Sequence, residues 1–251
     1  MARDTWNPDQ YARFRNERQQ PFFDLLALVR TEPQMRVVDL GCGTGELTRA
    51  LHRHLGARET LGLDSSDAMI ARSDAHAEPG LRFERRDIGA FAPVEPFDLV
   101  FSNAALHWLP DHPTLLARLT GALRPGGQLA VQVPANHDHP SHVVAAEVAA
   151  EFGIQPRAWP VLLPERYAAV LDGLGYVEQH VRLQVYVHHL DSREDVVEWV
   201  KGTLLTDYER QLSGADFARF LERYRERLLP LLEDTRPYFY AFKRILMWGR
   251  R

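Results

Sequence analysis

Three glycines at alternate positions, Gly41, Gly43 and Gly45, follow a short apolar segment that ends at Asp39-Leu40 and precede a helix-like run over residues 46–55. Glycine loses more backbone entropy on folding than other residues, so three in five positions indicate unusual main-chain dihedrals or close approach to a ligand. The amides that open the following helix would face the same ligand. The D-x-G-x-G-x-G spacing differs from the G-x-G-x-x-G of nicotinamide-binding loops, because the third glycine comes one residue early.

Asp64 ends a second strand-like segment over residues 59–64, and it lies 23 positions after Gly41 (64 − 41). In nucleotide-binding α/β sheets an acid near that offset accepts hydrogen bonds from the ribose. A carboxylate suits two neighbouring hydroxyl donors because it has two acceptor oxygens. The favoured interpretation of Asp64 is therefore ribose binding, and the alternative is a helix cap.

Asp87 and Ile88 follow a third predicted strand over residues 81–85. An acid beside a bulky apolar side chain suits an adenine ring, since the acid can accept from the amino group while the aliphatic chain lies on the ring. A solvated loop acid is the alternative. A fourth, nearly continuous apolar strand over residues 97–103 ends at Asn103.

These residues are positioned by strands that alternate with helices, and a fifth strand is predicted over residues 128–133 after a turn at residues 124–127. This alternation specifies a parallel sheet with right-handed crossovers, whose ligands lie beyond the carboxyl ends of the strands. Further strands are predicted over residues 177–189 and 238–248. The expected fold is α/β: a Rossmann-like, seven-stranded, mostly parallel sheet with helices on both faces, plus a helical lid inserted before the last strand.

The composition is that of an ordinary globular protein, with 251 residues, 45% hydrophobic and 25% charged. A net charge of −4 gives no indication of the basic surface that binds nucleic acid. The single cysteine, Cys42, excludes an internal disulfide and favours the cytoplasm. Its place in the glycine loop favours a small packing residue over a nucleophile. No leader pattern and no apolar run of 18 residues is present, so no membrane association is expected.

The expected organisation is an N-terminal helical preface over residues 1–30, a core over 31–134, and a helical lid with the closing strands over 135–251. Tyr11 and Arg18 of the preface either pack or face a ligand. Three histidines lie within residues 137–142, but their spacing matches no trusted ligand pattern, and no metal is expected.

The glycine loop, Asp64, the triplet at residues 86–88 and the turn at residues 123–127 resemble the successive motifs of the class I S-adenosylmethionine-dependent methyltransferases. A closer resemblance, to the trans-aconitate 2-methyltransferases, extends along nearly the whole chain and thins over residues 135–236. It rests on Trp6-Asn7-Pro8 with Tyr11, Phe14 and Arg18, on Asp64-Ser65-Ser66 with Met69-Ile70, on Ser102-Asn103-Ala104 with Leu106 and residues 108–112, and on Gln132-Val133-Pro134.

The resemblance implies a bacterial enzyme, monomeric or weakly dimeric, that uses S-adenosyl-L-methionine to esterify a carboxylate of trans-aconitate or a related small polycarboxylic acid. It also implies that the last strand runs antiparallel. Alternatives are another small or carrier-bound acid, a carbon nucleophile, or a non-catalytic protein that only binds the cofactor. The residues assigned to the cofactor are Asp39, Gly41, Gly43, Gly45, Asp64, Ser65, Met69, Asp87, Ile88, Asn103, Tyr11 and Arg18.

A carboxylate acceptor is already ionised at neutral pH, so no general base is required. His107, which follows the fourth strand, is therefore predicted not to be a base, and Trp108 is predicted to line the acceptor pocket. A polyanionic acceptor needs cations, and the planar fork of arginine matches carboxylates best. The candidates are Arg18, Arg157, Arg166 and Arg236, with Trp159, Tyr238 and Tyr240 as pocket walls; surface solvation is the alternative for each arginine.

Overall fold

The computed structural model describes residues 15–155 and 159–251, and side chains only from residue 19 onward within the first of these ranges. The chain divides into two compact units. The core unit comprises residues 16–134, 160–184 and 244–251, and the helical unit comprises the described parts of residues 1–15, 135–159 and 185–243.

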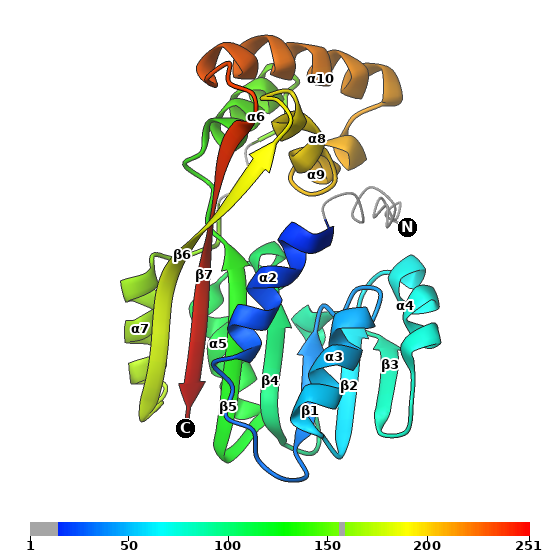
Figure 1. Ribbon diagram of the computed structural model, residues 1–251, viewed down its shortest axis with the longest axis vertical. Coiled ribbons are helices and arrows are strands. Elements are labelled where there is room, and N and C mark those ends of the chain that lie inside the picture. Colours follow the sequence, from blue (N-terminus) through cyan, green and yellow to red (C-terminus); the bar gives the residue numbers. More distant parts are fainter. Residues whose placement is uncertain (1–14, 156–158) are drawn as a thin grey trace. The chain divides into compact units, whose positions relative to one another are not determined.

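Seven strands form one sheet, in the order β3-β2-β1-β4-β5-β7-β6 (Figure 1). Their bounds are β1 Arg36–Leu40, β2 Glu59–Asp64, β3 Leu81–Arg85, β4 Phe97–Asn103, β5 Leu123–Pro134, β6 Glu178–Leu190 and β7 Tyr238–Arg250. The strands from β3 to β5 pair in parallel, and β7 pairs antiparallel with β5. The predicted Rossmann-like sheet with an antiparallel last strand is confirmed.

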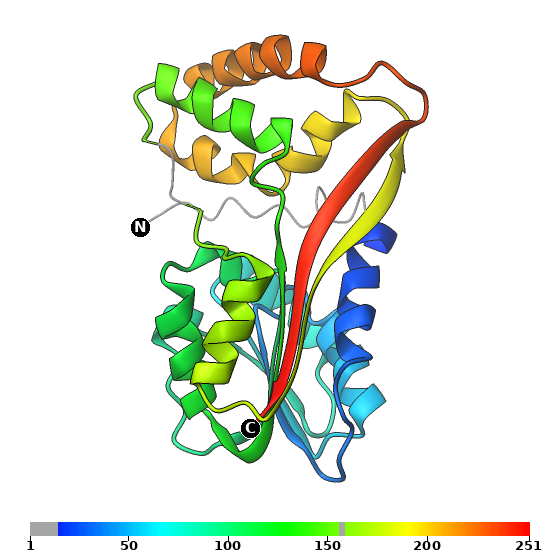
Figure 2. The same cartoon turned by 90° about the vertical axis from the view of Figure 1, so that its left-hand side faces the viewer.

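Helices cover both faces of the sheet in the core unit. Figure 1 shows α2 and α3 in front of the sheet, with α5 and α7 behind it, and Figure 2 separates the two layers in an edge-on view. The bounds are α2 Arg15–Leu26, α3 Glu46–Leu55, α4 Asp67–Ser73, α5 His112–Gly121 and α7 Pro164–Gly173. Strand β1 is buried on both sides, since Val37, Val38 and Leu40 are all at 0% exposure, and this explains why apolar residues occupy positions on both of its faces.

The predicted turn at residues 124–127 is wrong. Strand β5 begins at Leu123, which pairs with Phe97 of β4, and the next pair is Leu99 with Gln128. The intervening residues form an irregularity within the strand, where Gly126 has a φ of 78°. Proline and two glycines locally favour a turn, but Leu123 is buried and its pairing with Phe97 extends the strand backward.

The helical unit contains α6 Pro140–Glu151, α8 Asp195–Lys201, α9 Leu205–Gln211 and α10 Gly214–Leu228. Its core is aromatic and includes the buried side chains of Trp199, Phe220, Tyr224 and Tyr240. The hydroxyl of Tyr224 donates to the Ser141 carbonyl over 2.9 Å, which ties α10 to the start of α6. A buried tyrosine is thereby hydrogen-bonded, as its desolvated hydroxyl requires.

Two serines near helix starts in this unit are each followed by an aspartate three residues later. Ser213 caps α10, because its hydroxyl accepts from the Asp216 amide over 3.1 Å. At Ser192, Asp195 accepts from the amide and the hydroxyl of the serine, which is the reciprocal half of a capping box, and α8 begins at Asp195. Within residues 15–155 and 159–251, no helix combines the length and apolarity needed to cross a bilayer.

Candidate functional site

The glycine loop between β1 and α3 adopts left-handed backbone conformations. Gly41, Gly43 and Gly45 have φ values of 83°, 55° and 80°. Such values are costly for residues that carry a Cβ atom. The amides of Gly41 and Cys42 both donate to the Leu63 carbonyl of β2, over 2.8 Å and 2.9 Å. The loop is thus held against the carboxyl end of the neighbouring strand.

Only the middle glycine leaves open space. A Cβ atom at Gly41 would lie 2.2 Å from the Ala105 Cβ, and one at Gly45 would lie 2.7 Å from the Phe83 ring. A Cβ at Gly43 would meet no atom of residues 15–155 or 159–251 within 4 Å. Packing within the chain therefore explains Gly41 and Gly45, whereas the space over Gly43 can be filled by a ligand. This is the fit expected where a loop lies under a cofactor.

Asp64 joins the glycine loop to α4. One carboxylate oxygen accepts from the Gly43 amide over 3.0 Å, and the other accepts from the Ser66 amide over 2.9 Å. The helix cap itself is Ser66, whose hydroxyl accepts from the Met69 amide. A carboxylate has about four lone-pair sites, so its chemistry suits both the amides of the loop and the hydroxyl donors of a ribose.

Asp39 is 3% exposed and lies beneath the loop, where it accepts from the Thr48 hydroxyl of α3 over 2.6 Å. Burial raises the pKa of Asp39 to about 7; Thr48 partly offsets this rise and the charge of Asp64 adds to it. Asp39 therefore positions α3 beside β1. Thr48 escaped sequence reasoning, although its place nine residues after Asp39, on the first turn of a helix, is a usable signal.

Replacing Asp39 by asparagine should change how stability depends on pH. Because the folded pKa of Asp39 lies above its ordinary value of 3.8, its contribution is fully present below pH 3.8 and is lost as pH rises through about 7. The Asp39→Asn variant cannot ionise and keeps an acceptor for Thr48. Urea unfolding at pH 5 and pH 8 should therefore show a smaller loss of free energy in the variant than in the parent. Equal losses would contradict the buried acid.

Ile88 reaches the loop, since its Cδ1 atom lies 3.8 Å from the position of a Cβ on Gly41. Its neighbour Asp87 is exposed and accepts from the Gly89 amide over 2.7 Å, which opens the short 3-10 helix η2 Ile88–Ala90. The aliphatic half of the predicted adenine site is thus next to the glycine loop. Of the residues implied by resemblance, Ser65 is exposed and Met69 is buried.

A buried histidine, His112, is hydrogen-bonded to the segment that follows β4. The 3-10 helix η3 Leu106–Trp108 carries the half-buried His107 and Trp108, whose rings lie 4.7 Å apart. His112 Nε2 donates to the Leu106 carbonyl over 3.1 Å, because a carbonyl can only accept. Its Nδ1 therefore accepts from the Tyr167 hydroxyl of α7. Burial lowers the pKa of His112, which favours this neutral form.

Two sequence features show no reactive character. Cys42 is buried, and burial raises the pKa of its thiol far above the usual range, as expected of a packing residue. In the helical unit, His139 and His142 both contact the Ser141 hydroxyl, and Asp138 pairs with Lys243. No three metal-ligating side chains converge anywhere in the described ranges.

The residues predicted to hold an acceptor are only partly described. Arg166 is exposed on α7 of the core unit, and Arg236 is exposed in the helical unit. Tyr238 is buried in the helical unit, and burial raises the pKa of its hydroxyl. Tyr11 and Arg157 lie outside the described residues, as does the side chain of Arg18. The assignments of these residues stay predictions.

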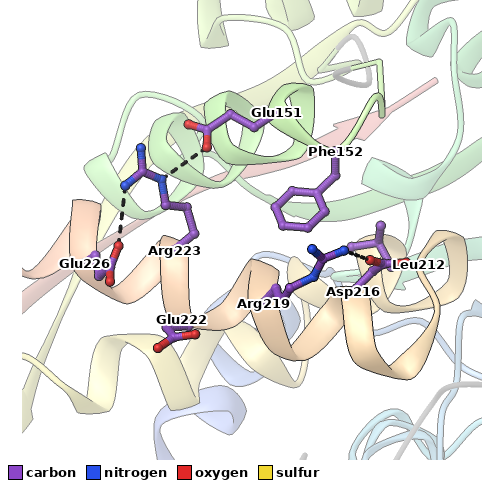
Figure 3. Close-up of a pocket in the computed structure, with 8 residues that line it drawn as sticks. All are labelled: Glu151, Phe152, Leu212, Asp216, Arg219, Glu222, Arg223 and Glu226. Carbon is purple, nitrogen blue, oxygen red and sulfur yellow. Dashed lines mark hydrogen bonds and ion pairs between the residues drawn. The ribbon is translucent and has the colours of Figure 1, made fainter.

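A pocket of about 630 Å³ lies on the helical unit between α6 and α10 (Figure 3). Its charged lining comprises four acids and two arginines: Glu151, Asp216, Glu222, Glu226, Arg219 and Arg223. Both arginines are paired, Arg219 with Asp216 and Arg223 with Glu151 and Glu226. An acidic lining with paired cations does not suit a polyanionic acceptor, so we do not assign this pocket to one.

Comparison with known proteins agrees with the geometry of the core unit. Residues 37–127 match a family model described as a methyltransferase domain. A trans-aconitate 2-methyltransferase from Deinococcus radiodurans is 50% identical over 98% of both chains. One from Streptomyces avermitilis is 37% identical over 96% of this chain and 95% of its own.

Solved structures share the fold. The YcgJ protein of Bacillus subtilis aligns with a TM-score of 0.63 at 13% identity, over 93% of this chain and 98% of its own. An S-adenosylmethionine-dependent methyltransferase from Mesorhizobium loti aligns with a TM-score of 0.52 at 22% identity, over 93% of this chain and 97% of its own. At these identities the likeness concerns the fold alone.

A seven-stranded sheet of this order, with a D-x-G-x-G-x-G loop open over its middle glycine, defines a class I S-adenosylmethionine-dependent methyltransferase. The full-length similarity is more specific than the fold. The chain belongs to the trans-aconitate 2-methyltransferase family. The predicted family, enzyme class and cofactor are thereby confirmed.

Proposed function

We propose that this protein transfers a methyl group from S-adenosylmethionine to a carboxylate of trans-aconitate and forms a monomethyl ester. The observation that carries the proposal is the open space over Gly43 beside Asp64, in a chain half identical to a named trans-aconitate 2-methyltransferase. Gly43 and Asp64 form the cofactor part of the proposed site. The identity of the acceptor is taken from the name of that relative.

The cofactor, when bound, supplies an electrophilic methyl group that an oxygen nucleophile can take up. Within the proposal, the glycine loop cradles its methionine part and Asp64 accepts from its ribose hydroxyls. Asp87 and Ile88 bind the adenine, the acid by accepting and the side chain by packing. Asn103, also assigned to the cofactor, lies at the carboxyl end of β4, the end of the strands at which ligands of such sheets bind.

The reaction needs no proton acceptor if the nucleophile is a carboxylate, because its reference pKa is near 4. Catalysis then depends on alignment and exclusion of water. His107→Gln should therefore retain kcat within about threefold, well under the tenfold that 1.4 kcal/mol represents. Steady-state assays would check this. Abolished turnover with intact binding of both substrates would instead favour a hydroxyl or carbon acceptor.

The direct test is incubation with methyl-labelled S-adenosylmethionine and a panel of trans-aconitate, cis-aconitate, citrate and isocitrate. Label should pass to trans-aconitate as a base-labile ester, and mass spectrometry should show a gain of one methyl group. Labelling of another acid alone would replace the acceptor and keep the enzyme class. Binding of S-adenosylhomocysteine without transfer to any acid tested would favour a non-catalytic protein.

The proposal includes a small-molecule carboxylic acid as the only substrate besides the cofactor. A net charge of −4 argues against a nucleic-acid partner. A single cysteine fits a cytoplasmic protein. We also propose that it acts as a monomer or weak dimer, which sedimentation at micromolar concentration would check.

A further inference from the structure

Gln132 of β5 has a buried amide nitrogen with no hydrogen-bond partner among the described residues, and the side chain is 0% exposed. Its carbonyl oxygen accepts from Arg244 Nη1 of β7 over 3.1 Å. A guanidinium can only donate, so the orientation of the amide is fixed and Nε2 points elsewhere. A donor buried without a partner is costly, about 1–3 kcal/mol, and calls for an explanation.

The other buried glutamine of the same strand provides the comparison. Gln128 is 1% exposed, and its oxygen accepts from the Arg30 amide and from Trp248 Nε1, each over 2.9 Å. Its nitrogen donates to the Arg30 carbonyl over 2.7 Å. Gln128 lies toward the amino end of the parallel strands and has both of its polar groups satisfied. Gln132 lies toward the carboxyl end, where ligands of such sheets bind.

Arg244 and Asn103 share the same end and face of the sheet. Gln132 pairs in register with Asn103 of β4 on one side and with Leu246 of β7 on the other, so these three side chains point to one face. Arg244, two residues before Leu246, points the same way. It pairs with Pro134, the last residue of β5, and is 5% exposed. The oxygen of the half-buried Asn103 is itself buried without a partner among residues 15–155 and 159–251.

We propose that Gln132 and Arg244 form a carboxylate-binding site that holds the acceptor, an inference that rests on the proposed function. The amide nitrogen of Gln132 and the guanidinium of Arg244 are adjacent donor groups, and bonds from a charged donor to a carboxylate are the strong ones. The loop and acids that fit the cofactor follow β1, β2 and β3. In the sheet order, β5 and β7 lie beyond β4 on the opposite side from those strands. The donors are therefore placed for the acceptor rather than for the adenosine.

The decisive variant is Gln132→Glu. A carboxylate at this position still accepts from Arg244, so a purely structural contact is kept or strengthened. The donor, however, becomes an anion that repels an acceptor carboxylate. With the enzyme saturated in S-adenosylhomocysteine, calorimetric titration with trans-aconitate should show at least a tenfold rise in Kd. The affinity for S-adenosylhomocysteine should stay within about threefold, and the melting temperature should not fall.

Two further variants complete the test. Gln128→Glu introduces a carboxylate into the same buried strand at the opposite end, and it should leave the Kd for trans-aconitate unchanged. Arg244→Met should raise the acceptor KM at least tenfold, and Arg244→Lys should recover part of that loss. A purely structural arginine would instead lower stability in both variants without shifting KM relative to kcat.

The outcomes separate the two levels of inference. If the wild type does not turn over trans-aconitate, the proposed function fails, and the same variants are titrated with the acid of the panel that is methylated. An acceptor Kd raised less than threefold in folded Gln132→Glu overturns the site. A selective loss of S-adenosylhomocysteine affinity overturns it as well, because the carboxylate bound would then be that of the cofactor.

Discussion

The Gly43→Val variant should bind S-adenosylhomocysteine roughly a hundredfold or more weakly than the parent, a loss of about 2.7 kcal/mol. Among the described residues no atom lies within 4 Å of a Cβ on Gly43, so the added side chain meets none of them. It would instead fill the space over the loop and block the close approach of a ligand to the backbone. Calorimetric titration of the folded variant measures this loss directly.

Gly56 is a matched control for the backbone strain in that experiment. It caps α3 with a φ of 54°, against 55° at Gly43, and a Cβ there also meets no atom within 4 Å in the part of the chain that the structure describes. Both valine variants force a side chain into the left-handed region, at about 1–2 kcal/mol each. Gly56→Val should therefore lose similar stability and keep its affinity for S-adenosylhomocysteine. Equal losses of affinity in the two variants would show that strain, not obstruction, weakens binding.

Much of the core unit is predictable because local and tertiary preferences agree there. The predicted segments 46–55 and 59–64 coincide with α3 and β2. The end of the apolar run, the glycines that follow it and the start of the amphipathic segment all mark the end of the strand and the start of the helix at the same positions. The rule that ligands bind at the carboxyl ends of parallel strands then brings Asp39, Asp64 and Asn103 to one rim without knowledge of strand order.

Prediction fails where a distant partner decides the structure. The run Pro125-Gly126-Gly127 favours a turn, yet the pairing of Leu123 with Phe97 makes it part of a strand. Arg244 lies in an apolar closing strand and contacts Gln132, 112 positions away in the chain. Periodicity along one strand carries no information about such a contact. An arginine at a buried position of a strand rich in apolar residues is nevertheless a signal that sequence reasoning could have used, because buried arginines are rare.

Asp64→Ala should weaken binding of S-adenosylhomocysteine by roughly tenfold to a hundredfold, since bonds to a charged acceptor contribute about 1.5–3 kcal/mol. The expected cause is loss of acceptors for the ribose hydroxyls. The substitution also removes the acceptor of the Gly43 and Ser66 amides, so a disturbed loop is the competing cause. A single measurement of affinity does not separate the two.

A ligand that lacks one hydroxyl separates them. The 2′-deoxyribose analogue of S-adenosylhomocysteine should bind the parent at least tenfold more weakly than the full ligand, because one donor to Asp64 is missing. In Asp64→Ala the two ligands should bind almost equally, since the acceptor is already absent. The four affinities form a double-mutant cycle that isolates the contact between Asp64 and the ribose hydroxyl. Ser66→Ala removes the hydroxyl that caps α4 and keeps Asp64; it should cost about 1 kcal/mol of stability and keep full discrimination. If Asp64→Ala still discriminates tenfold, Asp64 acts by holding Gly43 in place, and another group binds the ribose.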